Sequence, residues 1–163
     1  MKHIICATVE NKIGVLAHIA GLFAARGYNI DSLAVAETES ANLSRMTIVA
    51  DDEGNEAIIE QIRKQLEKVI NVVKVNDLTR EEHIERDLAL VRVNVPAGRR
   101  GEIIEIVDIF RGRIADVGVK DMVVEVTGAE EKIEAIVDLL RPYGIKELVR
   151  TGRIAMTRGT RTK

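Results

Sequence analysis

The residues of this chain best suited to hold a small ligand lie in the stretch VENKIGVL, residues 9–16. An apolar run ends there at an Asn and a Gly, and the periodic apolar residues of a helix follow. The first N–H groups of a helix lack intrahelical partners and carry partial positive charge, so a carboxylate binds there readily. Gly14 removes a Cβ where such a ligand would approach, and Asn11 offers an uncharged donor and acceptor.

A second amide, Asn29 in RGYNI, precedes a predicted strand. A helix terminus, two Asn amides and nearby Leu and Ile side chains suit one class of ligand, a small zwitterion with an apolar side chain. The alternative interpretation is structural: Asn11 caps the helix and Asn29 forms a turn. The spacing of these residues leaves both interpretations open.

The other residue types that perform chemistry do not form a recognisable catalytic or metal site. His3, His18 and His83 are far apart in sequence and lack the i, i+4 companion of a metal-binding helix. The single Cys6 excludes an internal disulfide and is typical of a small buried hydrophobe. GRRGE at 98–102 fits a weak anion site or a helix start with surface arginines. We therefore expect no catalytic residue, metal or cofactor on this chain.

The amino-acid composition limits the kinds of partner that this chain is expected to bind. The 24 basic and 26 acidic residues are intermixed and leave a net charge of −2, so no basic face for nucleic acid is indicated. No apolar stretch reaches the roughly 18–20 residues that span a bilayer, and the N-terminus lacks a signal sequence, so we expect a cytoplasmic protein with no membrane contact. The basic tail from Arg150 to Lys163 is expected to be a solvated C-terminus, with a contact to a partner as the alternative.

Hydrophobic periodicity predicts the elements that must position the loop at 9–16. Alternation indicates strands over residues 2–10, 30–39, 43–50 and 69–78. One helix begins at Gly14, and a second, capped by Asp51 or Asp52, buries a stripe of apolar residues: Ile58, Ile59, Ile62, Leu66 and Val69. A charged linker at 79–87 follows, after which the same β-α-β-β-α-β order repeats, its second helix stopped at Pro142 and its last strand spanning 146–156.

The order predicts an α+β protein of two tandem ferredoxin-like βαββαβ domains, residues 1–78 and 88–163. Right-handed crossovers place the four strands of each sheet in the order 4-1-3-2, with both helices on one face. The second strand, residues 30–38, is then an apolar edge. Because domains of this size bury a modest share of their surface, we expect a homodimer that pairs edge to edge through that strand.

The sequence resembles the amino-acid-binding ACT domain and, more narrowly, the small regulatory subunits of acetolactate synthase (acetohydroxyacid synthase). The resemblance rests on VENKIGVLAHIAGLFAARGYNIDSLAVAETES, LSRMTIV, HIERDLALVRV and IFRGRIADV. A general ACT domain would share only the N-x-x-G-x-L pattern, which is Asn11, Gly14 and Leu16 here.

The resemblance implies a first domain of the ACT type in a regulatory subunit without catalysis of its own. Such a subunit binds and activates a large catalytic subunit that uses thiamine diphosphate, Mg²⁺ and FAD to form acetolactate from two pyruvates. It also confers feedback inhibition by valine, with leucine or isoleucine as alternative effectors. An ACT-type amino-acid sensor of another enzyme or a transcription factor remains the alternative. The family's effector site falls on these residues: Asn11, Lys12, Ile13, Gly14, Val15 and Leu16, with Asn29 and Ile30 from the facing protomer.

Overall fold

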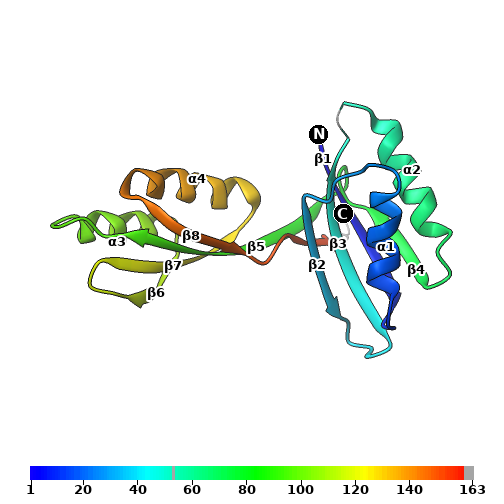
Figure 1. Cartoon of the computed structure of the whole chain (residues 1–163), viewed down its shortest axis with the longest axis horizontal. Coiled ribbons are helices and arrows are strands. Elements are labelled where there is room, and N and C mark those ends of the chain that lie inside the picture. The colour runs from blue at the N-terminus through cyan, green and yellow to red at the C-terminus, as the bar shows by residue number, and fades with distance from the viewer. Residues whose placement is uncertain (53, 160–163) are drawn as a thin grey trace. The chain divides into compact units, whose positions relative to one another are not determined.

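The computed structural model describes residues 1–52 and 54–159 and divides the chain into two compact units. The first unit comprises Met1–Ile84 together with Arg153–Lys163, and the second comprises Glu85–Gly152. Each contains an antiparallel sheet and two α-helices, so the α+β fold with two βαββαβ arrangements is confirmed (Figure 1). None of the described helices is long and apolar enough to cross a membrane.

The first unit follows the predicted order of elements. They are β1 (Lys2–Glu10), α1 (Val15–Ala24), β2 (Ser32–Glu37), β3 (Leu43–Asp51), α2 (Glu56–Glu67) and β4 (Val72–Asp77). The sheet order is β2-β3-β1-β4, which confirms the 4-1-3-2 arrangement and places β2 at an edge. The core lies between the sheet and both helices, where inward residues of β1 such as Ile5 and Val9 pack with Ile19, Phe23 and Ile62.

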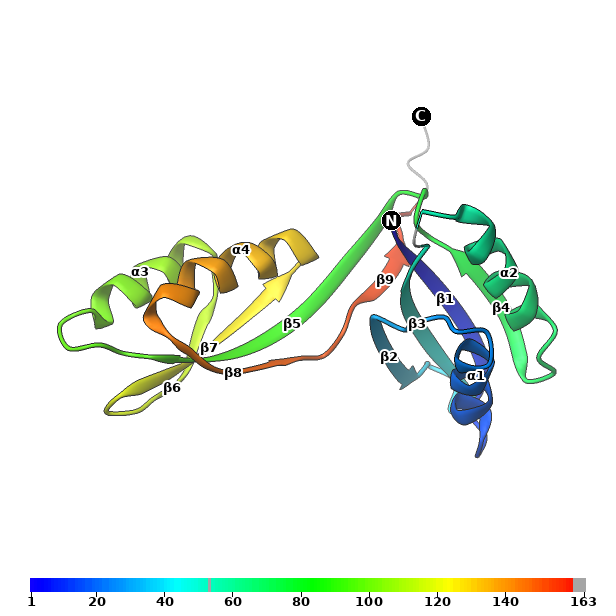
Figure 2. The ribbon, with the colours of Figure 1, turned by 45° about the horizontal axis from the view of Figure 1, so that its top comes forward.

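The opposite face of this sheet is covered by the C-terminal segment. β9 (Ile154–Thr157) lies there, and its Ala155 completes an apolar cluster with Ile4, Cys6, Val49 and Leu78 (Figure 2). The carbonyl oxygen of Ala155 accepts from Arg45 Nη2 at 2.9 Å and from Cys6 Sγ at 3.7 Å. The expectation of a solvated tail is therefore wrong for Arg153 and Ala155, which are buried, whereas residues 156–159 are exposed. Arg161 and Lys163 lie outside the described residues.

The second unit repeats the arrangement with its own core. Its elements are β5 (His83–Asn94), α3 (Arg100–Ile109), β6 (Arg113–Val117), β7 (Asp121–Gly128), α4 (Glu130–Leu140), the 3₁₀ helix η1 (Arg141–Tyr143) and β8 (Ile145–Arg150). Four strands run in the order β6-β7-β5-β8. Apolar residues of β5 and β7 such as Val91 and Val124 pack against Ile103 of α3 and Ile133 of α4. As predicted, α4 ends before Pro142, which lies in η1.

Three local expectations differ from the structure. The predicted linker at 79–87 is partly strand, because β5 already begins at His83 and Asp87 pairs with Gly128 in the sheet ladder. The strand predicted over 146–156 is interrupted between β8 and β9, with Gly152 at φ 84 in the gap. Helix α2 is capped by Asn55, whose side chain accepts from the Ala57 N–H, rather than by Asp51 or Asp52.

Candidate functional site

The β1–α1 loop presents an open helix N-terminus. Gly14 is the N-cap residue of α1 at φ 86 and ψ −12, a left-handed conformation that glycine adopts without steric cost. No side chain caps this helix. The Val15 N–H donates to the carbonyl oxygen of Lys12 at 3.4 Å and the His18 N–H to that of Gly14 at 2.9 Å. The N–H groups of Leu16 and Ala17, between them, are the ones that this helix start can offer to an anion.

Asn11 connects this loop to the β2–β3 hairpin through hydrogen bonds and does not cap α1. Its Nδ2 donates to Glu37 Oε1 at 2.9 Å and to the carbonyl oxygen of Ala41 at 3.0 Å. Its backbone N–H donates to the carbonyl oxygen of Asn42 at 2.8 Å. The capping interpretation is therefore wrong, and Glu37 joins the site as a residue that the sequence did not single out. Glu37 is 26 positions from Asn11 in the sequence, so only the register of β2 in the sheet shows that the two side chains meet.

Asn29 lies at the other end of β2, where its Nδ2 donates to Asp31 Oδ1 at 2.6 Å. In the ladder, Ser32 is opposite Val49 and Glu37 is opposite Ser44, so β2 runs from the Asn29 end to the Asn11 end of the sheet. Six extended residues span about 20 Å. The structure therefore does not bring Asn29 and Asn11 together within one chain.

The remaining predicted site residues differ in how far their side chains are exposed to solvent. Ile13 at the loop tip is fully exposed and Leu16 is 44% exposed, so both side chains are accessible to a ligand or partner. Val15 is buried in the core and offers only its backbone to the site, while Ile30 packs partly against the same core. Lys12 Nζ pairs with Glu10 Oε2 at 3.0 Å. Lys12 therefore adds little net charge to the loop.

Two of the three histidines and the two arginines of GRRGE have hydrogen-bond or ion-pair partners, while His18 is exposed on α1. The buried His3 has Nε2 3.1 Å from Asp52 Oδ2, and His83 Nδ1 lies 2.7 Å from the carbonyl oxygen of Glu81. Arg99 pairs with Glu102 at 2.7 Å, while Arg100 donates to the carbonyl oxygen of Gly118 at 3.1 Å. Within residues 1–52 and 54–159, no group of three or more His, Cys, Asp or Glu side chains is arranged to hold a metal ion.

Comparison with known proteins gives the family of this chain. Residues 5–74 match the model described as the AHAS small subunit-like ACT domain, and residues 86–159 match the model described as the small subunit of acetolactate synthase. The chain belongs to the acetolactate synthase small-subunit family. The resemblance stated from the sequence is thereby confirmed.

Members of the acetolactate synthase small-subunit family match this chain along its whole length. A probable acetolactate synthase small subunit of Archaeoglobus fulgidus is 54% identical over 161 residues, covering 99% of each chain. The acetolactate synthase small subunit of Bacillus subtilis is 49% identical over all of this chain and 94% of the relative. The crystal structure of the small subunit from Thermotoga maritima is 41% identical with a TM-score of 0.87, covering 98% of this chain and 99% of that one.

Proposed function

We propose that this chain is the regulatory subunit of acetolactate synthase, that it activates the catalytic subunit, and that it confers feedback inhibition by valine. The catalytic partner would carry thiamine diphosphate, Mg²⁺ and FAD and would form acetolactate from two pyruvates. The regulatory chain itself would hold no cofactor and would act in the cytoplasm. Membership of the small-subunit family supports the assignment to this enzyme.

The observation that carries the effector proposal is the open N-terminus of α1 behind Gly14. Its first-turn N–H groups have no capping side chain, so they suit the carboxylate of a free amino acid. Glu37, held beside the loop by Asn11, adds a negative charge of the sign that attracts an α-ammonium group. The exposed Ile13 and Leu16 supply apolar surface for a branched side chain. These are the three recognition elements of an apolar zwitterion.

A second chain would complete this site. β2 is an edge strand, and its two ends carry Asn29 and the Asn11 loop respectively. Antiparallel pairing of β2 with its own copy about a two-fold axis would place Asn29 of the partner subunit near the Asn11 loop of the first. We therefore propose a homodimer with two effector sites, each shared between chains. Effector binding would then change how the two first units associate.

The proposed function is tested with the isolated chain and with the purified catalytic subunit. Valine should bind the isolated chain in calorimetry, and leucine and isoleucine should be titrated alongside, because one methylene changes affinity by only about 1–3 kcal/mol. Gly14→Asp and Asn29→Lys should abolish binding, the first by filling the ligand approach and the second by adding a charge. Unchanged binding in both variants would contradict the proposed site.

Activity of the catalytic subunit, measured with and without this chain, tests the regulatory role. A coupling free energy of about 1–3 kcal/mol corresponds to a change of about 5- to 150-fold. We expect activation by the chain alone and loss of activation with valine. Valine binding without any effect on the catalytic subunit would instead indicate an amino-acid sensor of another enzyme or a transcription factor.

A further inference from the structure

The end of the first unit that carries the β1–α1 loop also carries two other exposed apolar residues. Ile70 follows α2 and is 96% exposed, and Val73 in β4 is 62% exposed. They lie beside β1, because the Glu10 N–H donates to the carbonyl oxygen of Asn71 at 2.8 Å. Figures 1 and 2 place the α2–β4 and β1–α1 loops at the same end of this unit. We name Lys68, Ile70, Val73 and Lys74 the α2–β4 patch.

The exposure of Val73 results from a β-bulge. The register of β4 against β1 moves from Val72 opposite Val9 to Lys74 opposite Thr8, so Val73 is the extra residue. A bulge disrupts the ladder at an edge and prevents another strand from pairing there. A protein that binds at this edge would therefore contact its side chains and would not add a strand to the sheet.

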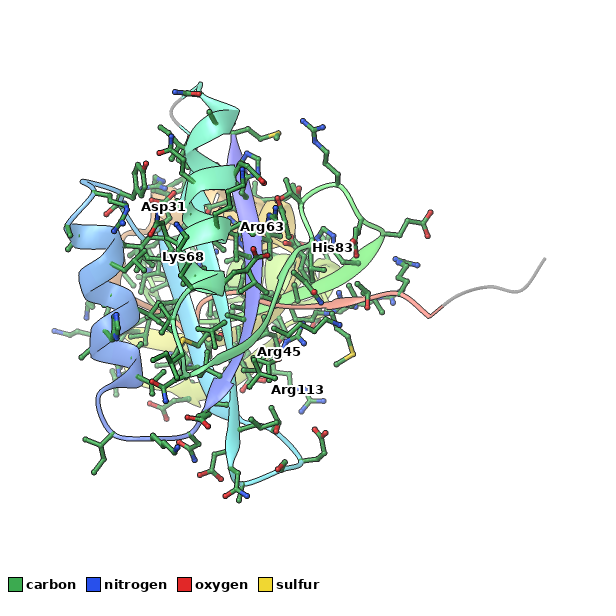
Figure 3. All side chains as sticks on the ribbon, turned by 90° about the vertical axis from the view of Figure 1, so that its right-hand side faces the viewer. Asp31, Arg45, Arg63, Lys68, His83 and Arg113 are labelled. Atoms are coloured by element: carbon green, nitrogen blue, oxygen red, sulfur yellow. The ribbon has the colours of Figure 1, made fainter. Side chains whose placement is uncertain are left out.

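The α2–β4 patch carries positive charge without a local counter-ion. Lys68 follows the last residue of α2 (Figure 3), and Lys74 follows Val73. In the part of the chain that the structure describes, neither lysine pairs with a carboxylate. The neighbouring charges are already compensated, since Lys12 pairs with Glu10 and Arg63 pairs with Glu67. Along the chain, Lys68 and Lys74 thus flank the exposed Ile70 and Val73.

We propose that the α2–β4 patch is the docking surface for the catalytic subunit, which would present an apolar depression bordered by carboxylates. This inference rests on the proposed function. A second copy of the chain is a poor occupant, because a two-fold contact would oppose this positive patch to itself. The opposite edge, β2, is the one proposed for the homodimer. Complementary charge would speed association with the catalytic subunit, while the buried aliphatic residues would slow dissociation.

This location also suggests how the effector acts on the catalytic subunit. Ile13 in the β1–α1 loop is fully exposed. Figure 2 places this loop and the α2–β4 loop at the same end of the unit. The β1–α1 loop is connected to the α2–β4 loop through Glu10, which accepts from the side chain of Asn71. A ligand at Gly14 would therefore change the margin of the docking surface directly.

The test compares two double variants with matched controls on the second unit. Ile70→Ser with Val73→Ser removes the apolar part of the patch, and Lys68→Glu with Lys74→Glu reverses its charge. The controls are Val119→Ser and Lys120→Glu, because Val119 is 90% exposed and Lys120 is exposed beside it. Each chain is titrated onto the purified catalytic subunit at two salt concentrations. Valine calorimetry and thermal melting establish that every variant is folded.

We expect each patch variant to bind the catalytic subunit at least about tenfold more weakly, as is typical of hot-spot residues. The charge reversal should also change the salt dependence of binding, whereas the controls should bind within about twofold of the unaltered chain. Patch variants that bind as tightly as the controls would overturn the docking surface alone. An unaltered chain that does not bind the catalytic subunit would overturn the proposed function itself. Patch variants that impair only dimer formation would assign the patch to a second copy and overturn the proposal.

Discussion

The side chain of Asn11 donates to the carboxylate of Glu37 across a distance of 2.9 Å. This hydrogen bond connects the loop that precedes α1 to the last residue of the edge strand β2. The proposed effector loop and the proposed dimer edge are therefore mechanically connected within one chain. A ligand that repositions Asn11 would act on β2 through a single contact.

Replacement of Glu37 by Ala should weaken valine binding about tenfold, because the Asn11 amide loses its acceptor and the loop loses its negative charge. Both residues are exposed, so the free energy of unfolding should change by less than about 0.5 kcal/mol. Calorimetry and urea unfolding measure the two effects separately. Glu39→Ala, an exposed acidic neighbour, is the control and should leave affinity within about twofold. Equal affinities for the two variants would exclude a role for Glu37.

Substitution of Ala155 by Asp should detach the C-terminal segment from the sheet. Ala155 is 5% exposed and lies against the cluster that contains Cys6, so a carboxylate there would have no hydrogen-bond partner and should cost about 1–3 kcal/mol. Since Cys6 is the chain's single cysteine and is 3% exposed, a thiol reagent reports the detachment directly. We expect its modification rate to rise at least tenfold.

The control for this experiment is Met156→Asp, because the adjacent Met156 is 65% exposed. It introduces the same charge into the same strand without burying it. Its Cys6 should react at the rate of the unaltered chain. Equal protection of Cys6 in both variants would show that β9 does not shield this face.

Replacement of Arg150 by Met should destabilise the second unit by about 2–3 kcal/mol, because the loss of one partner leaves a buried carboxylate uncompensated. Arg150 Nε donates to Asp87 Oδ2 at 2.6 Å, and the side chain of Asp87 is 1% exposed. Hydrogen exchange of the β5 and β8 amides measures the effect. Arg141→Met is the control, since its pair with Asp138 is exposed on both sides and should contribute less than about 0.5 kcal/mol. Similar protection in the two variants would contradict the prediction.

Asp52 should make the stability of the first unit dependent on pH. Hydrogen bonds from the Met1 amino group, the Gly54 N–H and His3 hold the pKa of Asp52 well below its usual range. Because the folded-state pKa is depressed, this stabilisation is fully present above the unfolded-state pKa of about 3.9 and is lost as the pH falls toward the folded-state pKa. The difference in unfolding free energy between the unaltered chain and Asp52→Asn should therefore be constant at neutral pH and narrow below about pH 4.

Urea unfolding at several pH values measures this difference. Asp138→Asn provides the comparison, because Asp138 is 69% exposed and its partner Arg141 is 67% exposed. Its effect on stability should stay small at every pH. A difference for Asp52→Asn that does not change between neutral and acidic pH would contradict the assigned role of the carboxylate.

Local sequence patterns predicted most of the fold because its core residues repeat with helical or strand periodicity. The stripe that includes Ile59, Ile62 and Leu66 is buried as expected. The alternation of Arg45 and Thr47 with Met46 and Ile48 also places the two pairs on opposite faces of β3, with Met46 and Ile48 in the helix-side core.

Two of the errors, at Asp87 and Arg150, fall where a polar residue has a partner distant in sequence. The charged sequence around each predicts a linker at Asp87 and a solvated tail from Arg150, but the two side chains, 63 positions apart, pair with each other. Their pairing is a property of the folded sheet and has no local signal. The same holds for the site, where Gly14 was recognisable from its position before a helix but Glu37 required the register of β2. The extra residue Val73 likewise depends on the pairing of β4 with β1.

The segment Arg153–Thr157 is made after the second unit but belongs to the unit that is made first. Chains emerge from the ribosome N-terminus first, at about 5–20 residues per second, and most domains fold as they emerge. Here β1 through β4 can form their sheet early, yet Ile4, Cys6 and Val49 remain uncovered until Ala155 has been synthesised. A nascent chain of this protein therefore exposes an apolar sheet face throughout translation of the second unit, until β9 has been synthesised and can cover it.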